Sequence, residues 1–133
     1  MRPVVLDPSV LVSALISPGG APGKLLLEIQ AGQFELIVSP ELVAELERVV
    51  RRDKFRRYIG LDEALEFVSF IRGEATLVPD PGHRTPLQSS DPKDNYLIAL
   101  AHGYSALLVS GDKHLLDLSG GAPILAPGDL LAR

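Results

Sequence analysis

The chain has 133 residues, which is close to the commonest size of a single domain, so we expect one domain over residues 1–133. No apolar run approaches the roughly 18 residues of a membrane span, and Asp7 interrupts the apolar region that a signal peptide would need. The absence of cysteine excludes disulfides and thiolate sites, and a net charge of −4 argues against broad non-specific nucleic-acid binding. We therefore expect a cytoplasmic protein that does not bind membranes.

The first half of the chain alternates short apolar segments with helical patterns. In chain order we predict a strand at 3–6, helices at 9–16 and 21–31, a strand at 34–38 and a helix at 40–52. Ser39 is placed to cap the last of these helices, and Pro40 is placed at its first position.

The second half continues the alternation. We predict a helix at 61–72, a strand at 75–78, a helix at 92–102, a strand at 106–109, a short helix at 112–118, a strand at 123–125 and a helical turn at 127–132. Continuous apolar strands that alternate with helices are typical of a parallel sheet with helices on both faces. Such sheets place their binding sites outside the carboxyl ends of the strands.

Acidic residues recur at the predicted carboxyl edge of this sheet. Asp7 ends the first strand, and Asp112 follows the strand at 106–109. The helix at 40–52 begins at the same edge and carries Glu41 and Glu45 in its first turns. If the helix at 92–102 runs antiparallel to the strand that follows it, Asp94 also lies there. Acidic residues from four separate segments of the chain are thus expected to meet at one edge.

Helical spacing separates the two aspartates of SSDPKDNYLIALA. Positions 94, 97, 98 and 101 follow the i, i+3, i+4, i+7 pattern, so Asp94 heads a stripe formed by Leu97, Ile98 and Ala101 and is expected to point inward. Asp91 is expected at the N-cap, with Pro92 at the first helical position, where the two residues position Asp94.

The same spacing does not choose between Glu45 and Glu47, which flank the apolar arc of the helix at 40–52 about equally. Closeness to the sheet edge slightly favours Glu45.

Carboxylates that lie close together repel one another and require a cation unless they are protonated. An all-oxygen set of this kind suits Mg²⁺ or Mn²⁺, which can activate a water molecule and orient a phosphodiester. Ser9 and Ser110 lie next to these acids and are candidates to hydrogen-bond a carboxylate or a metal-bound water. Each acid also has a structural alternative, since a helix cap or an exposed surface position would explain it alone.

Positive charge is concentrated in one segment. Residues 48–57 (RVVRRDKFRR) hold six of the thirteen Lys and Arg residues. The predicted contacts for phosphate or for an acidic partner are Arg51, Arg52, Lys54, Arg56 and Arg57. The alternative is a solvated helix face.

Four motifs in this order resemble the PIN-domain family, and together they cover nearly the whole chain. They are VVLDPSVLVSAL, SPELVAELERVVRR, SDPKDNYLIALA and LLVSGDKHLL. The second motif selects Glu45 over Glu47. The chain is most similar to the small prokaryotic PIN proteins that act as toxins of toxin–antitoxin pairs (the VapC-like group).

The resemblance implies a three-layer α/β/α sandwich around a parallel sheet of about five strands. It also implies a ribonuclease that uses Mg²⁺ or Mn²⁺ to hydrolyse RNA phosphodiester bonds, and a homodimer with a small antitoxin partner. The acidic positions that match the family motifs, as catalytic residues and metal ligands, are Asp7, Glu45, Asp94 and Asp112.

The chain departs from the family pattern at Pro8, where a threonine is usual. Proline has neither a side-chain hydroxyl nor a backbone N–H, so an alternative is a catalytically impaired PIN scaffold that binds RNA or protein. A receiver-like signalling domain would require paired acids after the first strand, and a haloacid dehalogenase would require a second aspartate at Ser9; the sequence offers neither.

Overall fold

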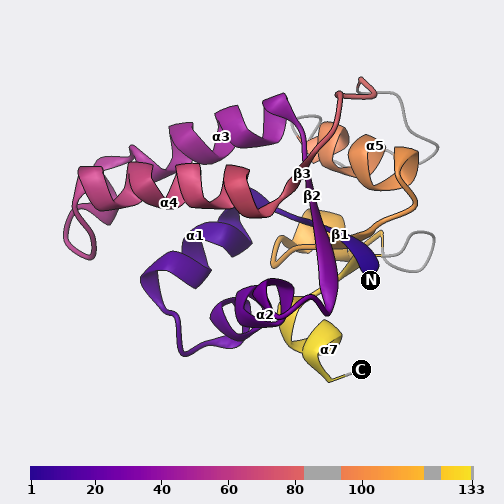
Figure 1. The fold of residues 1–133 in the computed structure, drawn as a ribbon, viewed down its shortest axis with the longest axis horizontal. Coiled ribbons are helices and arrows are strands. Elements are labelled where there is room, and N and C mark those ends of the chain that lie inside the picture. Colours follow the sequence, from indigo (N-terminus) through magenta and orange to yellow (C-terminus); the bar gives the residue numbers. More distant parts are fainter. Residues whose placement is uncertain (83–93, 119–123, 133) are drawn as a thin grey trace.

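The computed structural model describes residues 1–82, 94–118 and 124–132 (Figure 1). Within these residues five parallel strands form one sheet in the order β3-β2-β1-β4-β5. The strands are β1 (Arg2–Leu6), β2 (Phe34–Val38), β3 (Thr76–Leu77), β4 (Leu107–Val109) and β5 (Ile124–Leu125). The predicted parallel sheet of about five strands is confirmed.

The central strand β1 shows why the sequence of the strands is continuously apolar. Val4, Val5 and Leu6 are all fully buried, since β1 is hydrogen-bonded to β2 on one side and to β4 on the other. Both faces of the sheet are covered by helices, so neither face of the strand requires polar side chains. In Figure 1, α5 lies on the other side of β1 and β2 from α1, α3 and α4.

The helices follow the strands in the predicted alternation. They are α1 (Pro8–Ile16), α2 (Ala21–Gln30), α3 (Pro40–Val50), α4 (Leu61–Glu74), α5 (Asn95–Gly103), α6 (Lys113–Leu116) and α7 (Pro127–Leu131). The predicted start of α3 is confirmed, because Ser39 Oγ accepts a hydrogen bond from Leu42 N at 3.2 Å and Pro40 occupies the first helical position. α3 packs against α1 and α4, and α5 packs against β1 and β4.

Several predicted boundaries were wrong by one or two residues. α3 ends at Val50 rather than at 52, and a 3₁₀ turn that was not predicted, η1 (Asp53–Phe55), follows it. The Arg56 guanidinium donates to Val50 O, which is one of the last carbonyls of α3. α6 begins after Asp112 rather than at it, because the Asp112 side chain caps the helix from outside.

The turn after α2 requires a residue with positive φ. Gly32 has φ of 84°, and the N–H groups of Gly32 and Gln33 donate to the carbonyls of Ile29 and Glu28. This is the Schellman arrangement, in which glycine avoids the steric cost of a Cβ. It returns the chain to β2 immediately after the helix.

No single helix within the described ranges is long and apolar enough to cross a membrane. α1 and α2 reach the required length only as a pair, and the pair is bent by 98°.

The sheet order creates a switch point between β1 and β4. From β1 the chain continues to β2 and β3 on one side, and it later returns to place β4 and β5 on the other side. At a switch point, the connections that follow the two neighbouring strands lead to opposite sides of the sheet. The space beyond the carboxyl ends of these strands therefore stays open to ligands. Asp7 follows β1 and Ser110 follows β4 at this place.

Candidate active site

Asp7 stands at the carboxyl end of β1 and is 8% exposed. Its backbone N–H donates to Val109 O at 2.9 Å, which ties it to β4. Oδ1 accepts from Ser9 N at 3.0 Å and so caps α1, and Oδ2 accepts from Ser110 Oγ at 2.8 Å. Two donors thus hold this buried carboxylate in one orientation.

Pro8 occupies the first position of α1, where an N–H would have no partner within the helix. The hydrogen bond that caps α1 comes instead from Ser9 N. The Asp7 carboxylate therefore has a backbone donor although proline follows it in the chain.

One face of α3 carries charged side chains toward the same place. Glu41, Glu45 and Arg48 occur at i, i+4 and i+7, which is the spacing of a single helical face. Arg52, two residues beyond the end of α3, lines the same pocket. Acidic side chains lie toward the N-terminus of α3 and basic ones toward its C-terminus, as the helix dipole favours.

The structure distinguishes the two glutamates that spacing left equivalent. The Glu45 side chain is 29% exposed, lines the pocket described below and forms an ion pair with Arg48. The Glu47 side chain is 53% exposed and pairs at 3.9 Å with Arg51, outside that pocket.

The third segment is the start of α5. Asp94 has helical backbone angles but its side chain does not cap the helix. α5 is buried almost throughout, from Asn95 to Ala101, so its burial is wider than the stripe that the sequence predicts. The predicted cap by Asp91 and Pro92 lies outside the described residues.

These three segments enclose a pocket of about 620 Å³, which we call the acidic pocket. Its lining residues are Asp7, Pro8, Ser9, Glu41, Glu45, Arg48, Val49, Arg52, Asp94, Tyr96 and Leu97. Three of the four predicted acidic site residues therefore line one pocket, although they are far apart in the chain.

Tyr96 is a member of this pocket that the sequence analysis did not single out. Burial raises the pKa of its hydroxyl well above the ordinary value. Nearby negative charges raise this pKa further, and they belong to Glu45, Asp7, Glu41 and Asp94. The Tyr96 phenol therefore stays protonated, and it interacts electrostatically with all four carboxylates. Helical spacing from Asp94 would not have found Tyr96, because residues two apart do not lie on the same face of a helix.

Arg48 was counted in the basic segment but was not predicted as a site residue. Its hydrogen bond to Glu45 and the Glu45 charge raise the pKa of the guanidinium, with smaller contributions from Tyr96 and Glu41. The spacing from Glu41 to Arg48 along α3 was the signal that would have found it.

Asp112, the fourth predicted acid, lies apart from the other three. It lines a neighbouring pocket of about 540 Å³ together with Ser9 and Ser13, not the acidic pocket. Its Oδ1 accepts from His114 N at 2.7 Å, and its backbone N donates to Ser110 Oγ at 2.9 Å. Ser110 thus connects Asp112 to Asp7, and Ser9 lines both pockets.

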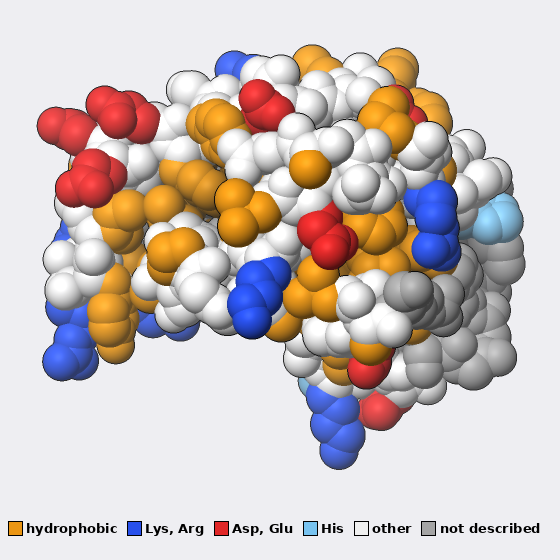
Figure 2. All heavy atoms as spheres, turned by 60° about the horizontal axis from the view of Figure 1, so that its bottom comes forward, with side chains coloured by type: hydrophobic (Ala, Val, Ile, Leu, Met, Phe, Trp, Pro, Cys, Tyr) orange, Lys and Arg blue, Asp and Glu red, His pale blue; other side chains and the backbone are white. Residues whose placement is uncertain are grey.

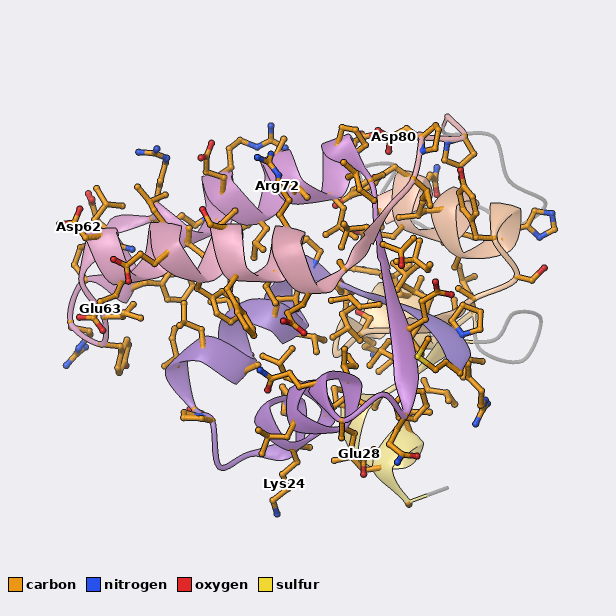
Figure 3. The ribbon with its side chains drawn as sticks, in the orientation of Figure 1. Lys24, Glu28, Asp62, Glu63, Arg72 and Asp80 are labelled. Carbon is orange, nitrogen blue, oxygen red and sulfur yellow. The ribbon has the colours of Figure 1, made fainter. Side chains whose placement is uncertain are left out.

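The segment before α5 supports the start of α3. Asp80 Oδ2 accepts from Glu41 N at 3.1 Å, and Figure 3 shows Asp80 beside the first turn of α3. Tyr104 Oη donates to Pro79 O at 2.9 Å, which ties the same segment to the end of α5. The two helices that carry Glu41 and Asp94 are therefore linked through residues 79–80.

The predicted basic contacts are not equivalent in the structure. Arg52 lines the acidic pocket, whereas Arg51 is an exposed partner of Glu47. Lys54 and Arg57 lie over the rings of Phe55 and Tyr58, at 5.1 and 5.5 Å from the ring centroids.

Arg56 differs from these residues, because its guanidinium turns back to Val50 O and two of its nitrogens are buried. It serves the end of α3 rather than the surface.

The exposed basic side chains also have acidic neighbours. At the left end of the molecule in Figure 2, red side chains occupy the upper part and blue side chains the lower part. Asp62 and Glu63, in the first turn of α4, are labelled at this end in Figure 3. The surface there is of mixed charge rather than a continuous positive patch, so Arg52 is the predicted basic residue with the clearest relation to the pocket.

The donor set of the acidic pocket suits a hard divalent cation, because its carboxylate oxygens are the ligands that Mg²⁺ and Mn²⁺ prefer. Among the described residues, no three Asp, Glu or His side chains are already grouped closely enough to coordinate one ion. The residues therefore fit the cation by chemistry and by their shared pocket, and Mg²⁺ commonly takes only one or two carboxylates beside water.

Comparison with known proteins gives the family. The family model described as PIN domain matches residues 3–114. The uncharacterized protein MJ1680 of Methanocaldococcus jannaschii is 30% identical over 115 residues, which cover 86% of this chain and 74% of that protein.

Two solved structures share the fold. The crystal structure of PAE2754 from Pyrobaculum aerophilum matches with a TM-score of 0.69 and 14% identity, over 99% of this chain and 88% of that chain. A chain in the crystal structure of VapBC2 from Rickettsia felis, bound to a DNA fragment from their promoter, matches with a TM-score of 0.63 and 15% identity, over 93% and 97%. With the sheet order, the acidic pocket and a family match that spans most of the sequence, this chain belongs to the PIN domain family.

Proposed function

We propose that the protein is a metal-dependent endoribonuclease and the toxin of a toxin–antitoxin pair. One observation carries the proposal: Asp7, Glu45 and Asp94, from three separate segments of a PIN-domain chain, line one pocket at the switch point of the sheet. An RNA substrate would place this activity in the cytoplasm.

The residues that would hold Mg²⁺ or Mn²⁺ are Asp7, Glu45 and Asp94, with Asp112 as an outer member of the set. When bound, the ion would neutralise negative charge and supply a water molecule of lowered pKa as a nucleophile for the phosphodiester. It would also offset the mutual repulsion of the carboxylates that line the pocket, which belong to Asp7, Glu41, Glu45 and Asp94.

The protein's own residues have separate tasks in this proposal. Ser9 N and Ser110 Oγ hold the two oxygens of Asp7, so its carboxylate keeps one orientation. Asp112 acts through Ser110, to which its backbone N–H donates. Arg52 lies at the basic end of the pocket and is suited to an RNA phosphate. Arg51, Lys54 and Arg57 would extend this contact to RNA or to an antitoxin.

The activity is tested by substituting the proposed ligands. Asp7→Asn and Asp94→Asn should each abolish cleavage of RNA in the presence of Mn²⁺, because an amide keeps the shape but removes the charge that a divalent ion needs. Asp62→Asn is the matched control, since this aspartate of α4 is exposed and does not line the acidic pocket. Undiminished cleavage by the purified Asp7→Asn protein would refute the nuclease assignment.

A catalytically impaired PIN scaffold that binds RNA or protein is the second candidate. Two observations favour it: Pro8 follows Asp7, and the described side chains do not form a ready group of three ligands. Calorimetric titration with Mn²⁺ separates the two candidates. Absence of binding at millimolar Mn²⁺ would favour the scaffold, and saturable binding that Asp94→Asn removes would favour the nuclease.

The partner proposal is an antitoxin that covers the acidic pocket of a homodimer. A similar fold occurs in the VapBC2 structure, which is bound to DNA from its own promoter, so a DNA-binding partner protein is the kind to seek. Charge reversal at Arg51, Lys54 and Arg57 should weaken binding of RNA or of this partner and reduce its salt dependence. Unchanged affinities for both would leave these residues as solvated surface.

A further inference from the structure

α3 carries two Glu–Arg ion pairs, and only one of them lies in the acidic pocket. Glu45 and Arg48 pair at i, i+3 and both line the pocket. Glu47 and Arg51 pair at i, i+4, with 3.9 Å between Glu47 Oε1 and Arg51 Nη2. Neither of these two residues lines the acidic pocket. The second pair is therefore an internal control for the effect of such a pair on α3 alone.

The carboxylate that Arg48 engages is one that a metal ion would need. Arg48 Nη2 donates to Glu45 Oε2, while Asp7, which lines the same pocket, accepts from Ser9 N and Ser110 Oγ. The Asp7 carboxylate is thus fixed by two hydrogen bonds, whereas the Glu45 carboxylate is held by the Arg48 guanidinium, which another cation can replace. The Glu45 oxygen that Arg48 engages must be released before it can bind a metal ion.

We propose that Arg48 and the divalent ion compete for Glu45, and that the Arg48 guanidinium, once released, binds the RNA phosphate beside Arg52. This inference rests on the proposed nuclease function and adds a phosphate-binding residue to it. Arg48 shares a face of α3 with Glu45 at i+3, and both line the pocket with Arg52, which follows the end of α3. Arg48 can therefore reach toward either the acidic or the basic end of the pocket.

The physical chemistry favours such an exchange. The Arg48 side chain is 68% exposed, and an exposed ion pair of this kind contributes little to stability, so it is easily replaced. A divalent ion offers twice the charge to a carboxylate that already has three acidic neighbours. The guanidinium then finds in phosphate a partner whose two oxygens match its planar fork.

The first test measures metal binding without RNA. Calorimetric titration of Arg48→Gln with Mn²⁺ should show roughly two- to fivefold tighter binding than the wild-type chain, because no guanidinium competes for Glu45. Arg52→Gln removes the same charge from the same pocket, and Arg51→Gln removes the partner of Glu47. Both should change the Mn²⁺ affinity clearly less than Arg48→Gln does.

The second test measures RNA binding with a short 2′-O-methyl oligonucleotide, which cannot be cleaved. Mn²⁺ should strengthen RNA binding to the wild-type chain more than to Arg48→Gln, because metal frees Arg48 only in the former. By linkage, RNA should strengthen Mn²⁺ binding by the same factor. Arg48→Lys keeps the charge without the planar fork, so it should restore competition for Mn²⁺ and recover the RNA effect only in part.

The outcomes separate this inference from the nuclease proposal. If wild-type protein binds Mn²⁺ and Arg48→Gln binds it equally well or more weakly, the role of Arg48 is refuted and the nuclease proposal stands. If Arg52→Gln tightens Mn²⁺ binding as much as Arg48→Gln, general charge rather than competition for Glu45 is responsible, which also refutes it. If neither wild type nor Arg48→Gln binds Mn²⁺ at millimolar concentration, both proposals fall.

Discussion

At the scale of single residues, the aspartates of the site differ in what surrounds them rather than in their chemistry. Asp7 is almost fully buried and accepts from Ser9 N and Ser110 Oγ. Asp112 is more exposed and uses Oδ1 to cap α6. The Asp7 carboxylate is buried and fixed, so another side chain cannot easily take its place. The Asp112 carboxylate lies in a neighbouring pocket, where its loss disturbs the acidic pocket less. Loss of Asp7 should therefore be more damaging than loss of Asp112.

Tyr96 gives a pH-dependent prediction at this scale. Its pKa in the folded protein lies above the ordinary value of 10.0 because of burial and of the surrounding carboxylates. At a pH between these two pKa values, the Tyr96 hydroxyl keeps its proton in the folded chain but has lost it in the unfolded chain. The contribution of Tyr96 to the free energy of unfolding is therefore fully present below about pH 10 and decreases as the pH rises above it.

Urea unfolding between about pH 9 and about pH 11 measures this slope. Tyr96→Phe should flatten it, because the substitution removes the titrating phenol. Tyr58→Phe, which alters an exposed tyrosine, is the control. An equally steep loss of stability in wild type and Tyr96→Phe would show that another group causes the decrease in stability at alkaline pH.

At the scale of elements, the starts of α1 and α3 place the site, and each begins with a proline at its first position. Asp7 caps α1 before Pro8, and Ser39 caps α3 before Pro40. The proline ring presets φ for the first turn and needs no N–H partner. Asp7 and Glu41 are thus held by helix starts whose direction is fixed locally.

Pro8→Thr tests whether the departure from the family pattern impairs the site. Asp7 already accepts a backbone and a side-chain hydrogen bond, so cleavage should change by less than about threefold. The free energy of unfolding should fall by roughly 0.5–1 kcal/mol, because threonine leaves the unfolded chain more freedom than proline does. Cleavage assays and urea unfolding check the two parts. A gain in cleavage of tenfold or more would mean, by the same comparison of rates, that Pro8 holds the activity down.

At the scale of the whole molecule, the sheet order brings together residues that are far apart in the sequence. Asp7 follows the central strand, Glu45 lies on the helix after its neighbour β2, and Asp94 lies on the helix before β4. Because β1 has β2 on one side and β4 on the other, all three meet beyond its carboxyl end. A cation bound there would connect the three segments that carry Asp7, Glu45 and Asp94. Its binding should therefore stabilise the whole folded chain.

Thermal unfolding with added metal checks this linkage. An ion that binds the folded chain alone adds about 2.7 kcal/mol at 100 times its Kd, so saturating Mn²⁺ should raise Tm by several degrees in the wild-type chain. Asp7→Asn should lose most of this shift, and the surface variant Asp62→Asn should keep it. A shift of equal size in wild type and Asp7→Asn would place the stabilising ion elsewhere.

Most of the fold followed from periodicity and from helix-start residues. Val4–Leu6 of β1 and Leu36–Val38 of β2 are apolar and buried because both faces of the sheet are covered, and Ser39–Pro40 marks the start of α3 correctly. The end of α3 and the turn η1 were not predicted, because they depend on the return of the Arg56 side chain to Val50 O. Such a contact has no periodic signature in a sequence.

By itself, the sequence determined the parallel α/β architecture, the PIN-domain motifs and the candidate acids, because these depend on residue type and local spacing. Only the tertiary structure decided which charges share a pocket. It grouped Asp7, Glu45 and Asp94 with Tyr96 and Arg48, set Asp112 in the neighbouring pocket and turned Glu47 away. The reason is physical: the strand order and the rotation of α3 and α5 about their axes fix these distances, and both arise from packing against the sheet.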